Sequence, residues 1–224
     1  MKLAVILYGP PGSGKGTQAS LAADKLDLIH FDTGRYLRSY LYDPKNKKLA
    51  VVRRERKIYE AGRLTTPSFV TGIVMKGVRD IAKAGYGVVF SGSPRTLYEA
   101  ERLAPFLAKL YGKTNVLVFR LIVSRETSLH RNSHRVLCEC CNMTVLRTLL
   151  PSLDHLRFCP FCGAKFKKRT DDEPEIIKRR IREYEERTGP VLSYMKRHGY
   201  RLHEIKGETV PYKVHAEILR RIKC

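Results

Sequence analysis

The stretch that most constrains the fold is GPPGSGKGT at residues 9–17, which joins an apolar run, Lys2–Tyr8, to a helical run, Gly16–Leu26. It contains the pattern G-x-x-x-x-G-K from Gly9 to Lys15. Glycines let successive backbone N–H groups turn inward around phosphate oxygens, and the following helix adds the positive end of its dipole. An ordinary glycine-rich turn is the alternative, but a position directly between a strand and a helix favours a phosphate-binding loop.

The side chains of this loop suit a nucleoside triphosphate. Lys15 brings a point charge to the β- and γ-phosphates, and Thr17 offers a hydroxyl to a magnesium ion. The residues expected to bind phosphate or magnesium here are Gly12, Ser13, Gly14, Lys15, Gly16 and Thr17.

Short apolar runs alternate with stretches of helical periodicity along most of the chain. Strands are expected at Lys2–Tyr8, Leu28–Phe31, Val88–Phe90, Val116–Val123 and Arg201–Ile205. Helices are expected at 16–26, 36–62, 66–85, 97–110, 173–187 and 212–222, with Gly189–Pro190 breaking the helix that begins at 173. Such alternation predicts an α/β protein with a doubly wound parallel sheet.

Composition sets wider limits. The chain has 224 residues and is 43% hydrophobic, enough for a sizeable core in one large α/β domain or two small ones. Its formal net charge is +21, which attracts polyanions, whether nucleotides, nucleic acid or an acidic membrane. No segment has the length of a membrane span and no signal sequence is evident, so we expect a soluble, cytoplasmic protein.

Five of the six cysteines lie between positions 138 and 162. Cys138-x2-Cys141 and Cys159-x2-Cys162 are separated by seventeen residues, a spacing typical of a tetrahedral zinc site in a reducing compartment. Cys140 lies within the first pair and leaves the ligand assignment open. Four thiolates would close the coordination sphere, so the metal is expected to be structural, and a zinc ribbon taken alone could equally bind nucleic acid.

Beyond the loop, the chain resembles the adenylate kinases, and their zinc-containing branch in particular, over nearly its full length. The shared segments are GPPGSGKGTQ, DTGRYLR (32–38), AGRL (61–64), GSPRT (92–96), the cysteine-rich insert and RTDD (169–172). The resemblance implies a P-loop three-layer sandwich with a five-stranded parallel sheet and two lids. The core would be 1–36, 67–134 and 173–224, the helical monophosphate-binding lid 37–66, and the zinc-binding ATP lid 135–172.

The resemblance also implies a reaction and its residues. A monomeric enzyme would transfer phosphate from ATP, with Mg²⁺, to a nucleoside monophosphate, AMP first and GMP as the alternative. By their match to family positions, Lys15, Arg95, Arg131, Arg135, Arg169 and Arg180 would act on the phosphates and the transferred group. Thr33, Gly34, Arg38, Gly92, Arg95 and Glu99 would contribute to nucleotide binding, with Arg38 and Arg95 on the monophosphate.

Three positions depart from the family pattern. Arg35 and Ser91 stand where the family has acids that order water around magnesium, so we expect a weaker magnesium shell and a lower rate, unless Asp32 substitutes in part. Glu99 stands where the family typically has a glutamine that reads the adenine of the monophosphate. Because an ionised carboxylate only accepts hydrogen bonds, Glu99 could still accept from the amine of adenine but would suit the donor pair of guanine better.

Two alternatives and one local question stay open at this stage. The loss of the two acids favours a nucleotide-binding but weakly catalytic protein, while the surplus charge and the zinc ribbon leave a less favoured nucleic-acid-associated protein. Asp171 and Asp172 either pair with lid arginines or simply favour the start of the next helix.

Overall fold

A central sheet of five parallel strands organises the protein. The structure, a computed structural model, describes residues 2–61, 63–141, 144–146, 157–168 and 172–222. The strand order is β2-β3-β1-β4-β8, and every neighbouring pair is parallel. The strands are β1 (Ala4–Tyr8), β2 (Leu28–Phe31), β3 (Gly87–Phe90), β4 (Val116–Ile122) and β8 (Arg201–Lys206). The five-stranded parallel sheet predicted from the sequence is confirmed.

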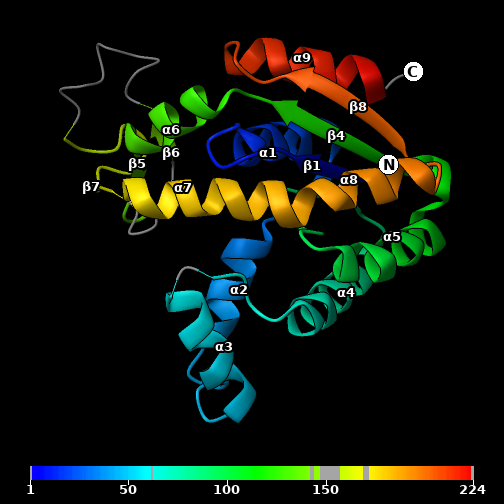
Figure 1. The fold of residues 1–224 in the computed structure, drawn as a ribbon, viewed down its shortest axis with the longest axis horizontal. Coiled ribbons are helices and arrows are strands. Elements are labelled where there is room, and N and C mark those ends of the chain that lie inside the picture. The colour runs from blue at the N-terminus through cyan, green and yellow to red at the C-terminus, as the bar shows by residue number, and fades with distance from the viewer. Residues whose placement is uncertain (1, 62, 142–143, 147–156, 169–171, 223–224) are drawn as a thin grey trace.

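Strand β1 shows why helices cover both faces of this sheet. Every residue of β1 is buried, and successive side chains point to opposite faces. Leu3, Val5 and Leu7 pack in one core cluster with residues of α1 (Lys15–Leu26) and α9 (Pro211–Ile222). Ala4, Ile6 and Tyr8 pack in the other with α4 (Pro67–Lys83), α5 (Leu97–Tyr111) and α8 (Gly189–Arg197). Figure 1 shows α9 on one side of the sheet and α4 and α5 on the other, as in a three-layer sandwich.

One long helical run crosses the molecule where a break was expected. α7 (Pro174–Glu183), a five-residue π-helix (Tyr184–Thr188) and α8 follow one another directly, and Figure 1 shows them as one continuous rod. Pro190 has no N–H, so it cannot donate the usual α-helical hydrogen bond to the carbonyl four residues earlier. The π-helix just before it forms hydrogen bonds that span five residues, and this change of spacing accommodates the missing donor. The break predicted at Gly189–Pro190 is therefore wrong.

A helical arm extends from the sheet beyond β2. It contains α2 (Thr33–Tyr42) and α3 (Ala50–Glu60), rather than the one long helix that was expected. The helix stops before Pro44, because a proline disfavours helical geometry in the residue that precedes it. Glu55 of α3 is fully buried and accepts hydrogen bonds from the N–H (2.7 Å) and hydroxyl (2.6 Å) of Thr66, which ties the arm to the start of α4.

The cysteine-rich region forms a second, antiparallel sheet at the N-terminal end of α7 (Figure 1). It follows α6 (Arg125–Ser133) and contains β5 (Arg135–Cys138), β6 (Thr144–Leu146) and β7 (Phe166–Lys167). Strand β5 lies in the middle and pairs with both neighbours. No helix in the described ranges of the chain is long and apolar enough to cross a membrane.

Candidate active site

The phosphate loop lies at the carboxyl end of β1 and opens helix α1. Gly12 and Gly14 adopt φ angles of 77° and 89°, which L side chains rarely adopt. A Cβ at Gly12 would lie 2.6 Å from Asn132 Nδ2 and 2.9 Å from the Ser128 carbonyl oxygen. Ser128 also donates its hydroxyl to the Pro11 carbonyl at 2.5 Å. Helix α6 therefore packs so tightly on this loop that only glycine fits at position 12.

Lys15 lies inside the loop. Its Nζ donates to the carbonyl oxygens of Gly9 (2.6 Å) and Pro10 (2.8 Å), with the Ser13 hydroxyl at 3.4 Å. The ammonium thus sits where the loop encircles it, at the positive end of the α1 dipole. This is the geometry in which a lysine can meet phosphate oxygens held by the loop.

Three arginines from distant parts of the chain lie near enough to Lys15 for their charges to act on it. Burial holds the pKa of Lys15 well below its usual range, and the positive charges of Arg95, Arg180 and Arg135 lower it further, in that order. Arg95 follows β3, Arg135 begins β5, and Arg180 lies on α7. The Asp32 carboxylate acts on the same pKa in the opposite direction. So much converging positive charge, with one carboxylate beside it, is suited to a highly anionic ligand.

Asp172 holds two of these arginines in place. Arg135 donates Nε–H to Asp172 Oδ2 at 2.6 Å and an Nη2–H to Oδ1 at 2.5 Å, and Arg180 Nη1 lies 3.6 Å from Oδ1. The Asp172 side chain is only 4% exposed. Of the two roles considered for this residue, pairing with arginines is the one observed. Asp171 lies outside the described residues, as does Arg169.

A second group of site residues, Thr33, Gly92 and Arg95, meets where α2 begins and β3 ends; we call it the Arg95 cradle. A Cβ at Gly92 would lie 3.2 Å from Arg95 Nη2 and 3.3 Å from Thr33 Cβ, so these three residues meet. Arg95 Nε donates to the Gly92 carbonyl at 2.7 Å, which orients the guanidinium. Thr33 Oγ1 is buried and has no hydrogen-bond partner within the part of the chain that the structure describes. A buried unpaired hydroxyl beside an arginine is a place for a polar ligand atom.

Glu99 lies next to Arg95, and its carboxylate accepts hydrogen bonds from neighbouring residues. Its carboxylate accepts from the Arg95 N–H at 3.0 Å and from the Thr96 hydroxyl at 3.0 Å, while Thr96 caps the start of α5. Burial raises the pKa of Glu99. Tyr8 of β1 is also buried, and its burial raises the pKa of its phenol. The charge of Glu99 raises this pKa further, which indicates that the two side chains lie near each other. Nothing in the residue pattern singles out Tyr8 beyond its position just before the loop.

Ser91 belongs to a hydrogen-bonded chain that sequence patterns did not reveal. His30 Nε2 lies 2.8 Å from Ser91 Oγ, and His30 Nδ1 lies 3.2 Å from Ser20 Oγ. The parallel pairing of β2 with β3, in which His30 lies opposite Val89, brings His30 within reach of Ser91 just after β3. Burial lowers the pKa of His30, and the nearby Arg35 charge lowers it while Asp32 raises it. At neutral pH the imidazole is therefore uncharged.

The other predicted residues lie on α1, α2 and α6. Arg131 on α6 donates to the carbonyl oxygens of Gly207 (2.8 Å) and Glu208 (3.0 Å) in the loop after β8. A Cβ on Gly207 would lie 3.4 Å from the Ser13 carbonyl oxygen, so that loop borders the phosphate loop. Arg38 is exposed on α2, Gly16 and Thr17 are exposed on the first turn of α1, and Gly34 lies beside Asp32 Oδ1.

The four paired cysteines form a site that fits zinc. Among the described residues, the ligand atoms of Cys138, Cys141, Cys159 and Cys162 all lie within 4.8 Å of one another. Sγ separations are 3.3 Å (138–162) and 3.6 Å (141–159). A tetrahedral centre with Zn–S bonds of about 2.3 Å places sulfurs about 3.8 Å apart, close to these values.

The chemistry of the cluster also favours a metal. Hydrogen bonds, first from the Ala164 N–H, lower the pKa of Cys162 to about 6, and a thiolate is the form that binds zinc. Cys140 is exposed and is not part of the four-ligand group. The zinc ligands predicted from spacing therefore converge as expected.

A phosphate loop on a parallel sheet, with a lysine and three arginines around it and a cysteine ribbon beside it, defines a P-loop enzyme that handles nucleotide phosphates. The family model for adenylate kinase matches residues 7–200. The chain is 34% identical over 217 residues to an adenylate kinase of Chlamydia pneumoniae, covering 97% of this chain and 96% of that protein. It is 35% identical over 195 residues to an adenylate kinase of Pelobacter propionicus, covering 87% and 86%. The chain belongs to the adenylate kinase family.

Proposed function

We propose that this protein transfers the γ-phosphoryl group of ATP to AMP and forms two molecules of ADP. An oxygen of the AMP phosphate attacks the γ-phosphorus, and the bond to the bridging oxygen of the departing ADP breaks. The observation that carries the proposal is the convergence of Lys15 with Arg95, Arg135 and Arg180 at the phosphate loop. Phosphoryl transfer needs in-line positioning and positive charge more than covalent help, and this cluster supplies that charge.

Each cation has a separate task in this proposal. Lys15 binds the β- and γ-phosphates of ATP within the loop. Arg95, oriented by Gly92 and close to the unpaired hydroxyl of Thr33, binds the phosphate of AMP. Arg135 and Arg180, positioned by Asp172, stabilise the charge on the transferred group; Arg131, Arg38 and Arg169 complete the binding of the two nucleotides.

Residues that fit a magnesium ion are present despite the loss of two acids. Thr17 offers an exposed hydroxyl on the first turn of α1, and Asp32 lies near enough to raise the pKa of Lys15. We assign these two residues to magnesium, held directly or through water. The ion would neutralise phosphate charge and align the two phosphates.

Two parts of the chain would close over the nucleotides. We assign 37–66 as the monophosphate lid, 135–172 as the zinc-containing ATP lid, and 1–36, 67–134 and 173–224 as the core. Asp172 sits at the boundary between the ATP lid and α7 and binds arginines from both sides. Closure would exclude water, which prevents hydrolysis of ATP.

We favour AMP over GMP as the acceptor. The two carboxylate oxygens of Glu99 already accept from the Arg95 N–H and the Thr96 hydroxyl, which leaves less capacity for the donor pair of guanine. We also propose that the enzyme works as a monomer in a reducing, cytoplasmic compartment, since its described cysteines are free thiols arranged for a metal.

The test is an assay of ADP formation with ATP, magnesium and each of AMP, GMP, CMP and UMP. AMP is expected to give the highest kcat/KM. Lys15→Met should lower kcat by about 10²–10³-fold, the loss expected for one preorganised charge. Lys25→Met, an exposed lysine on the same helix, is the matched control and should keep the wild-type rate. Absence of monophosphate-dependent ADP formation with all four acceptors would contradict the proposal.

A further inference from the structure

The segment that carries the second cysteine pair has an unusual composition. Residues 157–168 read RFCPFCGAKFKK and interleave three phenylalanines with four cations and no acid. The phenylalanines are Phe158, Phe161 and Phe166; the cations are Arg157, Lys165, Lys167 and Lys168. The zinc ligands Cys159 and Cys162 account for the fold of this segment, but they do not account for its aromatic and basic side chains.

Two of these phenylalanines face water. Phe161 is 73% exposed and Phe158 is 53% exposed, and Phe161 has the largest exposed fraction among the large hydrophobic residues that the structure describes. Burial of an aromatic side chain is what makes it favourable for folding, so an exposed ring contributes little to stability. Phenylalanine also has no polar group that would benefit from water, which makes its position at this surface a sign of binding.

The backbone holds these rings in fixed positions. Cys159 N–H donates to the Ala164 carbonyl at 2.8 Å, and Gly163 N–H donates to the Cys159 carbonyl at 2.9 Å. Phe158 and Lys165 form an antiparallel bridge. Phe161 stands at the tip of this turn, between the two zinc ligands. A rigid turn presents an aromatic ring at low entropic cost, because few rotamers must be fixed on binding.

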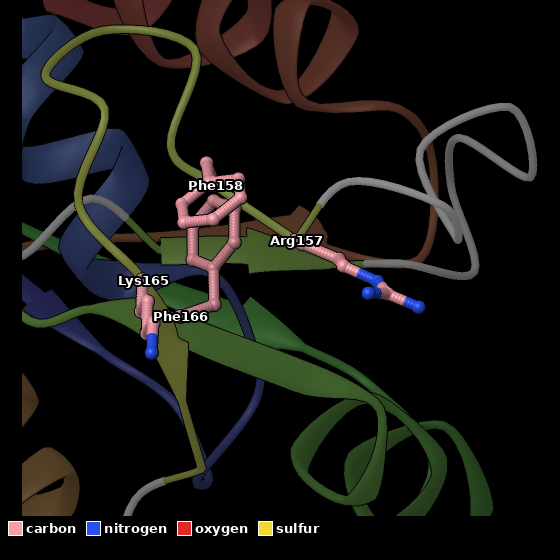
Figure 2. A pocket seen from close by; sticks show the side chains of 4 residues that line it. All are labelled: Arg157, Phe158, Lys165 and Phe166. Atoms are coloured by element: carbon pink, nitrogen blue, oxygen red, sulfur yellow. The ribbon is translucent and has the colours of Figure 1, made fainter.

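A hollow opens beside the rings of Phe158 and Phe166. It has a volume of about 440 Å³ and is lined by Arg157, Phe158, Lys165 and Phe166. Figure 2 shows the rings of Phe158 and Phe166 at the centre of the view, with the side chains of Arg157 and Lys165 extending to opposite sides. A flat, aromatic ligand with negative charge on either side matches this arrangement of apolar centre and cationic flanks.

Nearby acids do not cancel this charge. Glu139 is exposed and its N–H donates to the Lys165 carbonyl at 3.0 Å, so one carboxylate lies at the border. Asp172 is committed to Arg135 and Arg180. The four cations of the segment therefore outnumber the single available acid among the described neighbours.

We propose that this surface, which we name the knuckle face (Arg157, Phe158, Phe161, Lys165, Phe166 and Lys167), binds single-stranded nucleic acid. Unpaired bases stack on Phe158 and Phe161, and the backbone phosphates pair with the flanking cations. Stacking on aromatic rings within a basic groove is the general mode by which proteins bind single strands without sequence preference. Duplexes fit poorly, because their bases are already stacked on one another.

An acidic membrane is the nearest competitor, since it also attracts cations and apolar side chains. The hollow beside Phe158 and Phe166 offers a recess to a flat base. Phe161, at the exposed tip of the turn, suits either a base or a lipid surface, so the vesicle arm of the test below decides between them. The net charge of +21 exceeds what two nucleotides require, and the remaining cations could pair with the phosphates of a nucleic acid.

The experiment measures fluorescence anisotropy of labelled fifteen-nucleotide oligo(dT) and oligo(U) with the full, zinc-loaded chain. A two-headed adenosine polyphosphate fills the kinase cleft throughout, so that the oligonucleotide reports on a separate surface. Binding to both single strands is expected to exceed binding to a fifteen-base-pair duplex, and the DNA and RNA arms show whether the sugar matters. Phe161→Ala should weaken single-strand affinity about tenfold, as expected for one lost stacked base.

Matched variants separate stacking from charge. Tyr212→Ala removes another aromatic residue, 68% exposed on α9, and should leave affinity unchanged. Lys165→Ala with Lys167→Ala should reduce the slope of log affinity against log salt by about 0.7 per lysine, whereas Lys83→Ala with Lys109→Ala, on α4 and α5, should not. Zinc content and ADP formation are measured for every variant to show that the ribbon and the kinase site are intact.

Three outcomes overturn the proposal. The first is that no single strand binds at 50 mM salt. The second is that duplex and single strand bind equally well and that Phe161→Ala does not alter their affinity. The third is that the protein binds anionic vesicles but no single strand. None of these outcomes bears on phosphoryl transfer, because ADP formation is measured independently in the same preparations.

Discussion

At the scale of single residues, the floor of the site is defined by Ser91 and its neighbours. The Ser91 hydroxyl lies 2.8 Å from His30 Nε2 at the carboxyl end of β3, and the side chain is buried. In the proposed function, this hydroxyl and the imidazole would stand where a carboxylate would otherwise order the magnesium shell. Asp32 is the acid that acts on Lys15 from this side of the cleft.

Ser91→Asp should raise turnover. A carboxylate at this position can hold magnesium-bound water, so we expect kcat to rise about tenfold and the magnesium concentration for half-maximal rate to fall. Steady-state assays over a magnesium titration measure both. Ser193→Asp adds the same charge at an exposed position of α8 and should change neither. A wild-type rate that Ser91→Asp leaves unaltered would show that the present residues already suffice.

His30 should make stability depend on pH. Burial keeps its pKa below the value of about 6.5 that it has in the unfolded chain. The unfolded state therefore binds more protons in that window, and the free energy of unfolding should fall as pH falls from about 6.5 to the lowered pKa. Below the lowered pKa both states are protonated and this contribution becomes constant.

Urea unfolding of the wild type and of His30→Gln between pH 5 and pH 7 measures this contribution. The glutamine variant should show a shallower dependence, and the difference isolates His30 because His203 and His215, whose pKa values burial also lowers, are unchanged. Identical slopes in the two proteins would assign the dependence to other groups.

At the scale of elements, we expect the small antiparallel sheet to depend on a metal bound by the four cysteines. Strands β5, β6 and β7 have four, three and two residues, too short to be stable alone. Two buried side chains of this region, Cys138 and Cys159, belong to the four-cysteine cluster that fits a metal. The large sheet, by contrast, has apolar clusters on both faces and no need of metal.

Removal of zinc should therefore unfold this sheet and spare the core. With a chelator, we expect amide hydrogen exchange to accelerate at 135–141 and 157–168 and to stay slow in β1 and β4, with loss of ADP formation. Cys162→Ser should lose zinc and behave like the chelated protein. Cys140→Ser should keep one zinc per chain; zinc loss in this variant would show that Cys140 is a ligand.

At the scale of the whole molecule, the net charge of +21 opposes folding. Positive side chains repel one another more in the compact state than in the extended chain, and salt screens this repulsion. Local pairs such as Arg120 with Glu204 (3.0 Å) and Arg56 with Glu60 (2.9 Å) are exposed and contribute little. The buried sheet clusters must supply most of the stability.

Sodium chloride should consequently stabilise the protein. If screening between 20 and 200 mM contributes about 1 kcal/mol, Tm should rise by about 2–4 °C for a chain of this size. Lys83→Glu with Lys109→Glu lowers the net charge from +21 to +17, since each change removes one positive and adds one negative charge. This variant should gain less from salt; an equal gain, measured by calorimetry, would point to specific ion binding.

Local patterns explain why part of this protein could be predicted from its sequence. The phosphate loop, the alternating strands and helices and the two cysteine pairs depend on residues close in the chain, and the structure confirms the parallel sheet and the cysteine cluster. The two errors in helices, one at 189–190 and one at 36–62, both lie at a proline: a break was expected at Pro190, where the helical run continues, and no break was expected at Pro44. A π-helix accommodated Pro190, while Pro44 ended α2.

By itself, the sequence determined the family, the position of the phosphate loop and the four cysteines of the cluster, because each rests on short spacing. Only the tertiary structure decided which arginines lie near enough to act on the charge of Lys15 and that Asp172 pairs with Arg135 and Arg180. It also decided that His30 reaches Ser91 and that the ring of Phe161 is exposed to solvent. These contacts join residues far apart in the chain. Strand order and register set them, and both follow from how the two core clusters pack around the whole sheet.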